Sequence, residues 1–363
     1  MPSIAGQRIV FLARRIDTPG GVERHAARVA EELANRGMHV TIFAEAPPPG
    51  SMLLPRRPGI DVVRFPVARN RFRRIPKIQT MLLSHWRALA SASLVHCHDS
   101  YTFIHWWLPF RLLLWSKPVW ITFHGYEGRV PPARMKIWQR HFAQRLTRGN
   151  ICVGSYIESW YGTKANVIVY GAVDKPESLP PPLRLASPKA AFLGRLASDT
   201  GALLYLDALR MLQERGIRIE TDICGDGPLR ESCERYANAY ALPTRFHGAV
   251  PNPIPWLEQS DLVFASGYLA LLESMSLDRL AVALYDNPLK KDYLAGLREA
   301  IGADHGGFIL AESAQAAADA IESAIRDPDR SIAMARLAGK WAREQTWSKL
   351  AQTYIRLWTS SAS

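Results

Sequence analysis

The sequence predicts an α/β protein made of two doubly wound parallel sheets that follow one another along the chain. Three observations predict it: a length of 363 residues, an ordinary globular composition (48% hydrophobic, 21% charged), and the repeated alternation of apolar and amphipathic runs. At roughly 150 residues per domain, this length suggests two domains. Strand–helix–strand alternation is typical of a parallel sheet covered by helices on both faces.

The first half of the chain begins with the strand-like run RIVFLA at 8–13. After a polar turn, apolar residues recur at helical spacing from Val22 to Leu33, and Gly37 ends this predicted helix. Further strand-like runs are HVTIFA (39–44), SLVHC (93–97), VWITFH (119–124), NICVG (150–154) and NVIVYG (166–171). We expect residues 1–173 to form the first domain.

The proline-rich stretch 174–188 interrupts this pattern, and because proline cannot donate to a sheet we expect an interdomain linker there. Strand-like runs then resume as AAFLG (190–194), IRIETDICG (217–225), TRFHGAV (244–250), DLVFAS (261–266) and LAVALYD (280–286). Helix-like runs at 203–212, 228–241 and 266–276 alternate with them. We expect a second domain at 189–340 and a C-terminal helix, 341–363, packing back on the first domain. Ligands would bind in a cleft facing the carboxyl ends of the strands.

Composition limits the possible locations and partners. The four cysteines form no CxxC pair, which favours a reducing, cytoplasmic location over a disulfide framework or a zinc site. No cleavable signal is evident, and charges and prolines interrupt the longest apolar stretch, at 103–120, so we expect no membrane-spanning segment. The net charge of +12 permits nucleic-acid binding, but no nucleic-acid-binding motif supports it.

A basic segment lies between Asp61 and Asp99, where no acidic residue occurs. Its cations alternate with apolar residues and include Arg69, Arg71, Arg73, Arg74 and Lys77. One interpretation is a solvated loop leading into a helix. The other is a surface that binds an acceptor or an anionic membrane, which would place the protein peripherally on the inner face of the cell membrane.

Gly20 and Gly21 stand between the first predicted strand and helix. Glycines there allow close approach of the backbone to a ligand, and the following helix start directs free N–H groups toward an anion. The alternative is a turn that only reverses the chain. The sequence is not GxGxxG, so a nicotinamide cofactor is poorly supported.

Six short motifs occur in an order that resembles one protein family. They are PGGVERH (19–25), FHG (123–125), FLGRL (192–196), CGDGPLR (224–230), FHGAV (246–250) and SGYLALLESMS (266–276). Together they resemble the retaining glycosyltransferases of group 1, a GT4-like class, over nearly the whole chain. The resemblance implies the GT-B fold, in which two Rossmann-like domains face one another across a cleft.

The resemblance also implies a hexosyltransferase that takes its sugar from a nucleotide-diphosphate sugar. The diphosphate would lie near Gly20, Gly21, the helix start after Gly267, and Arg195, whose guanidinium matches phosphate oxygens. Val250 would line the donor site. His124 would hydrogen-bond the donor sugar, although a histidine that only satisfies a loop carbonyl is the alternative. No metal or other cofactor would then be needed, and Asp327 and Asp329 are expected to start a helix instead.

Two departures from the family pattern concern the donor site. In similar enzymes two glutamates are separated by seven residues; Glu273 matches the second, which contacts the ribose, but Ala265 stands where the first is expected. Thr200 replaces the usual phosphate-binding lysine. We expect Lys290 or Lys291 to take over the phosphate contact, and Asp199 or backbone groups to contact the sugar.

These departures leave three functional interpretations. The favoured one is a working transferase, because a retaining reaction assisted by the leaving phosphate needs no protein nucleophile. A catalytically inactive binding or scaffold protein is the alternative, and an epimerase of the same fold is less well supported. The acceptor would be a glycan, a lipid-linked saccharide or a lipopolysaccharide-type glycan.

Four further polar residues are expected to have roles other than catalysis. His96, His98 and Asp99 end a strand, and no third metal ligand is evident, so they are expected to shape a loop or an acceptor pocket. Asp226 is expected to cap the helix that follows it.

Overall fold

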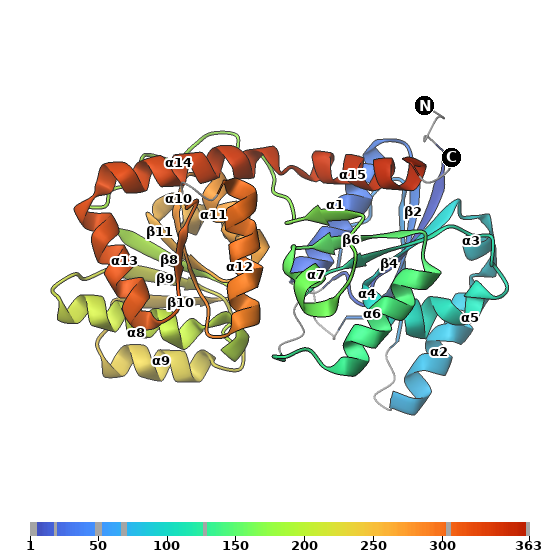
Figure 1. Cartoon of the computed structure of the whole chain (residues 1–363), viewed down its shortest axis with the longest axis horizontal. Coiled ribbons are helices and arrows are strands. Elements are labelled where there is room, and N and C mark those ends of the chain that lie inside the picture. The colour runs from blue at the N-terminus through green and yellow to red at the C-terminus, as the bar shows by residue number, and fades with distance from the viewer. Residues whose placement is uncertain are drawn as a thin grey trace. The chain divides into compact units, whose positions relative to one another are not determined.

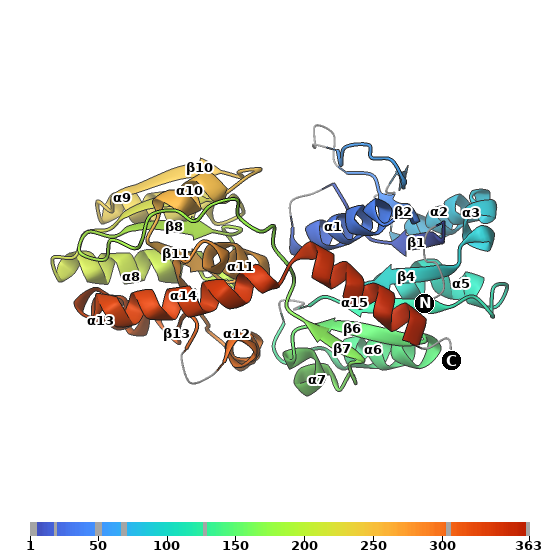
Figure 2. The same ribbon diagram turned by 90° about the horizontal axis from the view of Figure 1, so that it is seen from above.

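The structure, a computed structural model, describes residues 6–17, 20–47, 53–66, 71–125, 129–302 and 306–360. The chain forms two compact units. The first unit contains residues up to Tyr170 together with Trp347 onward, and the second contains Gly171–Thr346. Helices flank a central sheet in each unit (Figures 1 and 2).

The first unit contains a seven-stranded sheet in the order β3-β2-β1-β4-β5-β6-β7, and every pairing is parallel. The strands are β1 (Arg8–Leu12), β2 (His39–Glu45), β3 (Ile60–Phe65), β4 (Leu94–His98), β5 (Val119–Phe123), β6 (Gly149–Val153) and β7 (Val167–Val169). Every residue of β4, β5 and β6 is buried, as expected for strands covered on both faces. The predicted strands are confirmed, whereas β3 was not predicted.

The helices of the first unit include a short π-helical turn. They are α1 (Gly21–Asn35), α2 (Arg71–Ser84), α3 (Trp86–Ser91), α4 (Asp99–Thr102), the π-turn Phe103–Trp107, α5 (Leu108–Arg111), α6 (Arg134–Leu146), α7 (Tyr156–Tyr161) and α15 (Trp347–Ser360). The long apolar stretch therefore divides into a π-turn, a short helix, a turn and β5. In the described part of the chain, no helix combines the length and apolar character needed to cross a membrane.

The second unit contains a six-stranded parallel sheet in the order β10-β9-β8-β11-β12-β13. Its strands are β8 (Lys189–Leu193), β9 (Glu220–Cys224), β10 (Thr244–Gly248), β11 (Leu262–Ala265), β12 (Leu280–Leu284) and β13 (Ile309–Ala311). Its helices are α8 (Ala202–Glu214), α9 (Arg230–Ala239), α10 (Ile254–Gln259), α11 (Tyr268–Ser276), α12 (Pro288–Ile301), α13 (Ala314–Arg326) and α14 (Pro328–Glu344), with a 3₁₀ turn at Ser198–Thr200. The predicted α/β class with two parallel sheets is confirmed.

The proline-rich stretch expected to link the domains packs against the second unit. Leu183 and Leu185 are buried in its hydrophobic core. The Asp261 carboxylate accepts hydrogen bonds from the backbone N–H groups of Arg184 (2.7 Å) and Lys189 (2.9 Å). Because these contacts hold its end and bury two of its leucines, the stretch forms part of the second unit.

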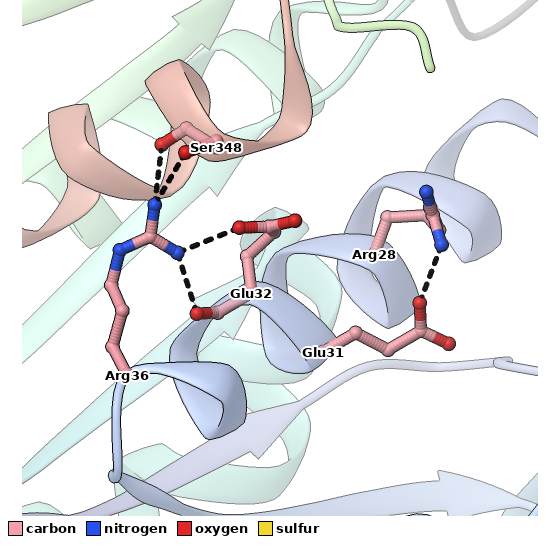
Figure 3. Close-up of polar contacts among 5 residues, drawn as sticks. All are labelled: Arg28, Glu31, Glu32, Arg36 and Ser348. Atoms are coloured by element: carbon pink, nitrogen blue, oxygen red, sulfur yellow. Dashed lines mark hydrogen bonds and ion pairs between the residues drawn. The ribbon is translucent and has the colours of Figure 1, made fainter. Parts of the chain in front are cut away.

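The C-terminal segment contains two helices where one was expected. Residues 341–344 complete α14, which packs on α11, and the close approach of these helices leaves no room for a side chain at Gly339. Only α15 returns to the first unit, where it lies along α1 (Figure 3). Arg36 of α1 donates to the Ser348 hydroxyl (2.7 Å) and carbonyl (3.1 Å) and also pairs with Glu32 (2.7 Å).

Candidate functional site

Four buried histidines gather near the carboxyl ends of the central strands of the first sheet. His25 comes from α1, His96 and His98 come from β4, and His124 follows β5. The ring centroids of His98 and His124 lie 5.2 Å apart, and those of His25 and His124 lie 4.8 Å apart. Neighbouring parallel strands bring these rings together because their carboxyl ends meet at one edge of the sheet.

Hydrogen bonds join this histidine cluster to α15. His98 Nδ1 lies 2.9 Å from His124 Nε2, and His96 Nε2 lies 2.7 Å from the Thr122 hydroxyl. The Tyr354 hydroxyl of α15 lies 2.8 Å from His25 Nε2 and 2.7 Å from the Thr122 hydroxyl. The C-terminal helix therefore closes a network that the sequence separates by more than 200 residues.

Burial keeps the histidine cluster uncharged. It lowers the pKa of His25 to about 3 and lowers the pKa of His96, His98 and His124 well below the ordinary value. Repulsion among the rings lowers the pKa of the last three further. At neutral pH His124 is therefore an uncharged imidazole, which suits hydrogen bonding to a hydroxyl better than binding an anion.

The backbone around His124 is fixed from two sides. Its N–H donates to the Asp99 carboxylate (2.8 Å), and Asp99 itself has a positive φ of 70°. Arg140 of α6 is buried, donates to the Gly125 carbonyl (2.9 Å) and lies over the Tyr161 ring at 3.9 Å. Asp99 therefore shapes this loop, which is one of the two roles expected of it.

Gly20 and Gly21 are exposed at the start of α1. Gly20 has extended backbone angles and, as the cap residue, offers no side chain to the helix; the Glu23 carboxylate lies close to it, where a side chain at Gly20 would meet it at 2.2 Å. The helix α1 therefore begins at this exposed glycine pair, and the binding of an anion by its first N–H groups stays a prediction.

In the second unit, two loops at the carboxyl ends of β8 and β9 lie against one another. The Leu196 N–H donates to the Asp226 carbonyl (2.9 Å), and a side chain at Gly225 would meet the Gly194 carbonyl oxygen at 1.8 Å. The Asp226 carboxylate accepts from the Gly227 N–H (2.7 Å), and α9 begins with Leu229 as its cap. The prediction that Asp226 caps this helix is therefore wrong.

Arg195 lies in the β8 loop with an exposed side chain. Its guanidinium pairs with the Asp199 carboxylate at 2.7 Å, and the Arg195 side chain is 69% exposed. The Thr200 hydroxyl donates to the Arg195 carbonyl (2.6 Å) and supports the loop from within. Arg195 is thus exposed enough to bind a ligand but is paired with an acid in this structure.

The loop before α11 is held by two stacked tyrosines. The rings of Tyr268 and Tyr293 lie 3.9 Å apart and nearly parallel. The Tyr293 hydroxyl accepts from the Tyr268 N–H (2.9 Å), and the Tyr268 hydroxyl donates to the Tyr293 carbonyl (2.6 Å). Because Gly267 has no side chain to cap the helix, Tyr293 supplies an oxygen to its first turn.

Lys290 of α12 is buried beside the same loop. Its ammonium donates to the Ser266 carbonyl and lies 4.5 Å from the centre of the Tyr293 ring. Burial lowers its pKa to about 8, against the opposing attraction of Asp199 and Asp286. Lys291, the other candidate, is exposed. The structure therefore brings Lys290 close enough to Asp199, the partner of Arg195, for their charges to interact.

Two further predicted donor residues also belong to the second unit. Glu273 of α11 is buried, with 5% of its surface exposed, and Val250 is half-buried two residues after β10. Asp327 caps α14 by accepting from the Arg330 N–H (3.2 Å), as expected for a helix start. Among the residues that the structure describes, no three His, Cys, Asp or Glu side chains are grouped to hold a metal ion.

Two arginines of the basic segment are less available to bind an acceptor or a membrane than the sequence suggested. Arg74 hydrogen-bonds the Glu45 carboxylate, which also pairs with Arg14 at 3.6 Å, and Arg64 binds Asp17 through two hydrogen bonds (2.6 and 2.8 Å). Arg74 and Arg64 therefore each have an acidic partner within the unit. Lys77 is exposed. Arg69 lies outside the described residues, as do the side chains of Arg71 and Arg73.

Sequence reasoning missed three residues of the first-unit site. His25 was quoted as the end of the PGGVERH motif but was given no role, and a buried position on the helix could have been inferred from its spacing to Val22 and Val29. Tyr354 and Arg140 had no signal in the sequence, because their roles depend on contacts with distant segments.

Comparison with known families finds two matches that follow one another along the chain. Residues 19–174 match the family described as Glycosyltransferase Family 4, and residues 187–327 match the family described as Glycosyl transferases group 1. A search of curated proteins finds no match by sequence.

Comparison with solved structures finds the same fold over nearly the whole chain. A glycosyltransferase from Rickettsia africae ESF-5 is 14% identical with a TM-score of 0.71, and the match covers 99% of both chains. WaaG, a glycosyltransferase involved in lipopolysaccharide biosynthesis, is 16% identical with a TM-score of 0.69, covering 97% of this chain and 99% of WaaG. The catalytic domain of starch synthase IV from Arabidopsis thaliana, bound to ADP and acarbose, is 14% identical with a TM-score of 0.70, covering 98% and 99%. At such identities these matches establish the GT-B fold alone.

Proposed function

The chain belongs to the group 1 glycosyltransferases, and we propose that it transfers a hexosyl group from a nucleotide-diphosphate sugar to a glycan or lipid-linked acceptor. We propose further that the anomeric configuration is retained and that the reaction needs no metal. The observation that carries this proposal is the grouping of Arg195, Lys290 and the start of α11 at the carboxyl edge of the second sheet.

These groups suit a leaving diphosphate. The exposed Arg195 guanidinium offers a planar pair of donors that could exchange Asp199 for phosphate oxygens. Lys290 stands in for the lysine that Thr200 replaces, since it lies near Asp199 and remains mostly protonated at pH 7. Such positive groups offset the charge that develops on the departing phosphate.

The absent first glutamate changes how the sugar would be held. At this position the chain has Ala265, and the loop that follows is fixed by the Tyr268–Tyr293 pair and by Lys290. In this proposal, backbone groups of this loop contact the sugar hydroxyls. No protein nucleophile takes part, and the leaving phosphate assists the acceptor hydroxyl.

The acceptor is proposed from structural neighbours and from charge. WaaG takes part in lipopolysaccharide biosynthesis, and one TarM structure contains UDP together with α-GlcNAc-glycerol. A lipid-linked or lipopolysaccharide-type glycan would suit a chain of net charge +12 that works at the inner face of an anionic membrane.

A ligand-stability screen tests the donor site. The protein would be melted with UDP, GDP, ADP and their sugars, without added metal, because a ligand that binds only the folded state raises its stability. We expect one nucleotide sugar to raise the melting temperature, and Arg195→Ala to abolish this effect. Arg235→Ala removes an exposed arginine from α9 and serves as the matched control.

The same screen separates the alternatives. No response to any nucleotide would favour the inactive scaffold. If a nucleotide sugar raises the melting temperature, and analysis of its products shows isomerisation of the sugar without transfer to an acceptor, the epimerase would be favoured.

A further inference from the structure

The turn that follows α5 presents three large apolar side chains to solvent. Leu112 is 85% exposed, Leu113 is 66% exposed and Trp115 is 76% exposed. All three come from one turn at 112–116, which we name the apolar turn. Isolated exposed leucines are ordinary, but a leucine pair with a tryptophan on one turn is typical of an interaction site.

The apolar turn is held in this shape by the two cations that flank it. Arg111 donates to the Trp115 carbonyl and, more weakly, to the Lys117 carbonyl (3.3 Å). The Lys117 ammonium donates to the Ala90 carbonyl (2.7 Å) and to the Ala92 carbonyl at the end of α3. Backbone hydrogen bonds from Leu114 and Lys117 complete the turn. Because Arg111 and Lys117 both hydrogen-bond backbone carbonyls, the turn cannot fold its apolar residues inward without breaking these hydrogen bonds.

The surroundings of the apolar turn are strongly basic. Along the sequence, residues 62–157 contain fifteen Lys and Arg residues and two acidic ones, Asp99 and Glu127, although two of the cations, Arg64 and Arg74, are paired with Asp17 and Glu45. Asp99 is bound to the His124 N–H at the carboxyl end of the sheet, whereas the apolar turn leads into the amino end of β5. Burial lowers the pKa of Arg111, and the charge of the exposed Arg148 lowers it further, so these two cations lie near one another. Arg87 is exposed on α3.

We propose that the apolar turn inserts into the interface of an anionic lipid bilayer while the surrounding cations bind lipid headgroups. Leucine side chains gain free energy on leaving water for the acyl boundary, and a tryptophan ring is favoured at the headgroup level. The cations add attraction to anionic lipids. Of the basic segment expected to meet the membrane, Arg87 belongs to this surface, whereas Arg74 is bound to Glu45.

A bilayer fits this surface better than a second copy of the chain. The apolar residues form the tip of a turn, and two such tips in contact would bring two strongly basic surfaces together, which repel one another. A fluid anionic interface accepts the tip and neutralises the cations at the same time. The proposal concerns where the protein meets the membrane and does not depend on the donor site.

Vesicle co-sedimentation tests the proposal with the full-length protein. The probes are phosphatidylcholine vesicles with and without phosphatidylglycerol, at low and high salt. We expect binding only to the anionic vesicles, weakened by salt. The variant Leu112→Ser/Leu113→Ser/Trp115→Ser should lower the partition coefficient by about tenfold or more, given about 0.8 kcal/mol per buried CH₂.

Matched variants keep the outcome interpretable. Leu179→Ser/Tyr240→Ser removes exposed apolar residues from the second unit and should bind vesicles like the wild type. The apolar-turn variant keeps Arg111 and Lys117, so its melting temperature should not change. Arg148→Glu should weaken binding to anionic vesicles alone.

Three results would overturn the proposal. The first is wild-type binding by the apolar-turn variant, and the second is equal binding of the wild type to neutral and anionic vesicles. The third is a lipid-free dimer that the variant converts to a monomer by light scattering, because the turn would then join two copies of the chain. The melting response to nucleotides reports separately on the donor site, so either proposal can fail without the other.

Discussion

Mild acid should unfold the first unit before the second, because the first unit buries four uncharged histidines. An unfolded histidine has a pKa near 6.5, and the folded pKa of His25 is about 3. Since the folded pKa is the lower one, the unfolded state binds more protons below pH 6.5. The stability due to neutral burial is therefore complete above pH 6.5 and is lost progressively as the pH falls toward the folded pKa.

The size of the effect follows from linkage. With a folded pKa of about 3, the neutral burial of His25 loses about 1 kcal/mol of stability at pH 6 and about 2 kcal/mol at pH 5. The lowered pKa values of His96, His98 and His124 act in the same direction, so the loss for the whole cluster is larger than that for His25 alone. Domains are typically stable by about 5–15 kcal/mol, so the loss at pH 5 is a large fraction of that stability.

Tryptophan fluorescence and calorimetry between pH 7.5 and 5 would measure this loss. Nine of the eleven tryptophans lie in the first unit, so their emission reports mainly on it. His39→Gln/His247→Gln changes two histidines that pair with Asp61 and Asp222 outside the histidine cluster, so the first unit of this variant should still unfold before the second in mild acid. A first-unit transition that does not move over this pH range would refute the reasoning, as would earlier unfolding of the second unit.

Three further predictions concern the second unit. Lys290→Met should weaken nucleotide binding measured by calorimetry, whereas Lys291→Met should not. The affinity of the wild type should fall as the pH rises through about 8, where the Lys290 ammonium loses its proton. Equal affinities for both variants would exclude Lys290 from the phosphate site. Gly225→Ala should cost about 1–3 kcal/mol or more in urea unfolding, because its methyl group would meet the Gly194 oxygen at 1.8 Å, whereas Gly267→Ala points into open space and should cost little. Glu273→Ala should weaken nucleotide binding without unfolding the protein; an unchanged affinity together with a large stability loss would show that this buried carboxylate is structural.

Local patterns in the sequence were enough to predict most strands and the parallel α/β class. Strands buried on both faces are continuous apolar runs, and glycine-rich turns separate them from amphipathic helices. The strand β3 was missed because IDVVRF includes two charged residues and its middle is only partly buried, so it did not stand out as an apolar run. The three residues of β13 are too few to give a period.

The sequence by itself determined which residue types stand at the carboxyl ends of the strands, including His124, Arg195 and the unusual Thr200. Only the tertiary structure decided which partners those residues have. Tyr354 meets His25 across 329 positions, and Arg74 is bound to Glu45 within the same unit. Periodicity and spacing record the local environment of each residue, whereas ion pairing and burial depend on segments that folding alone brings together.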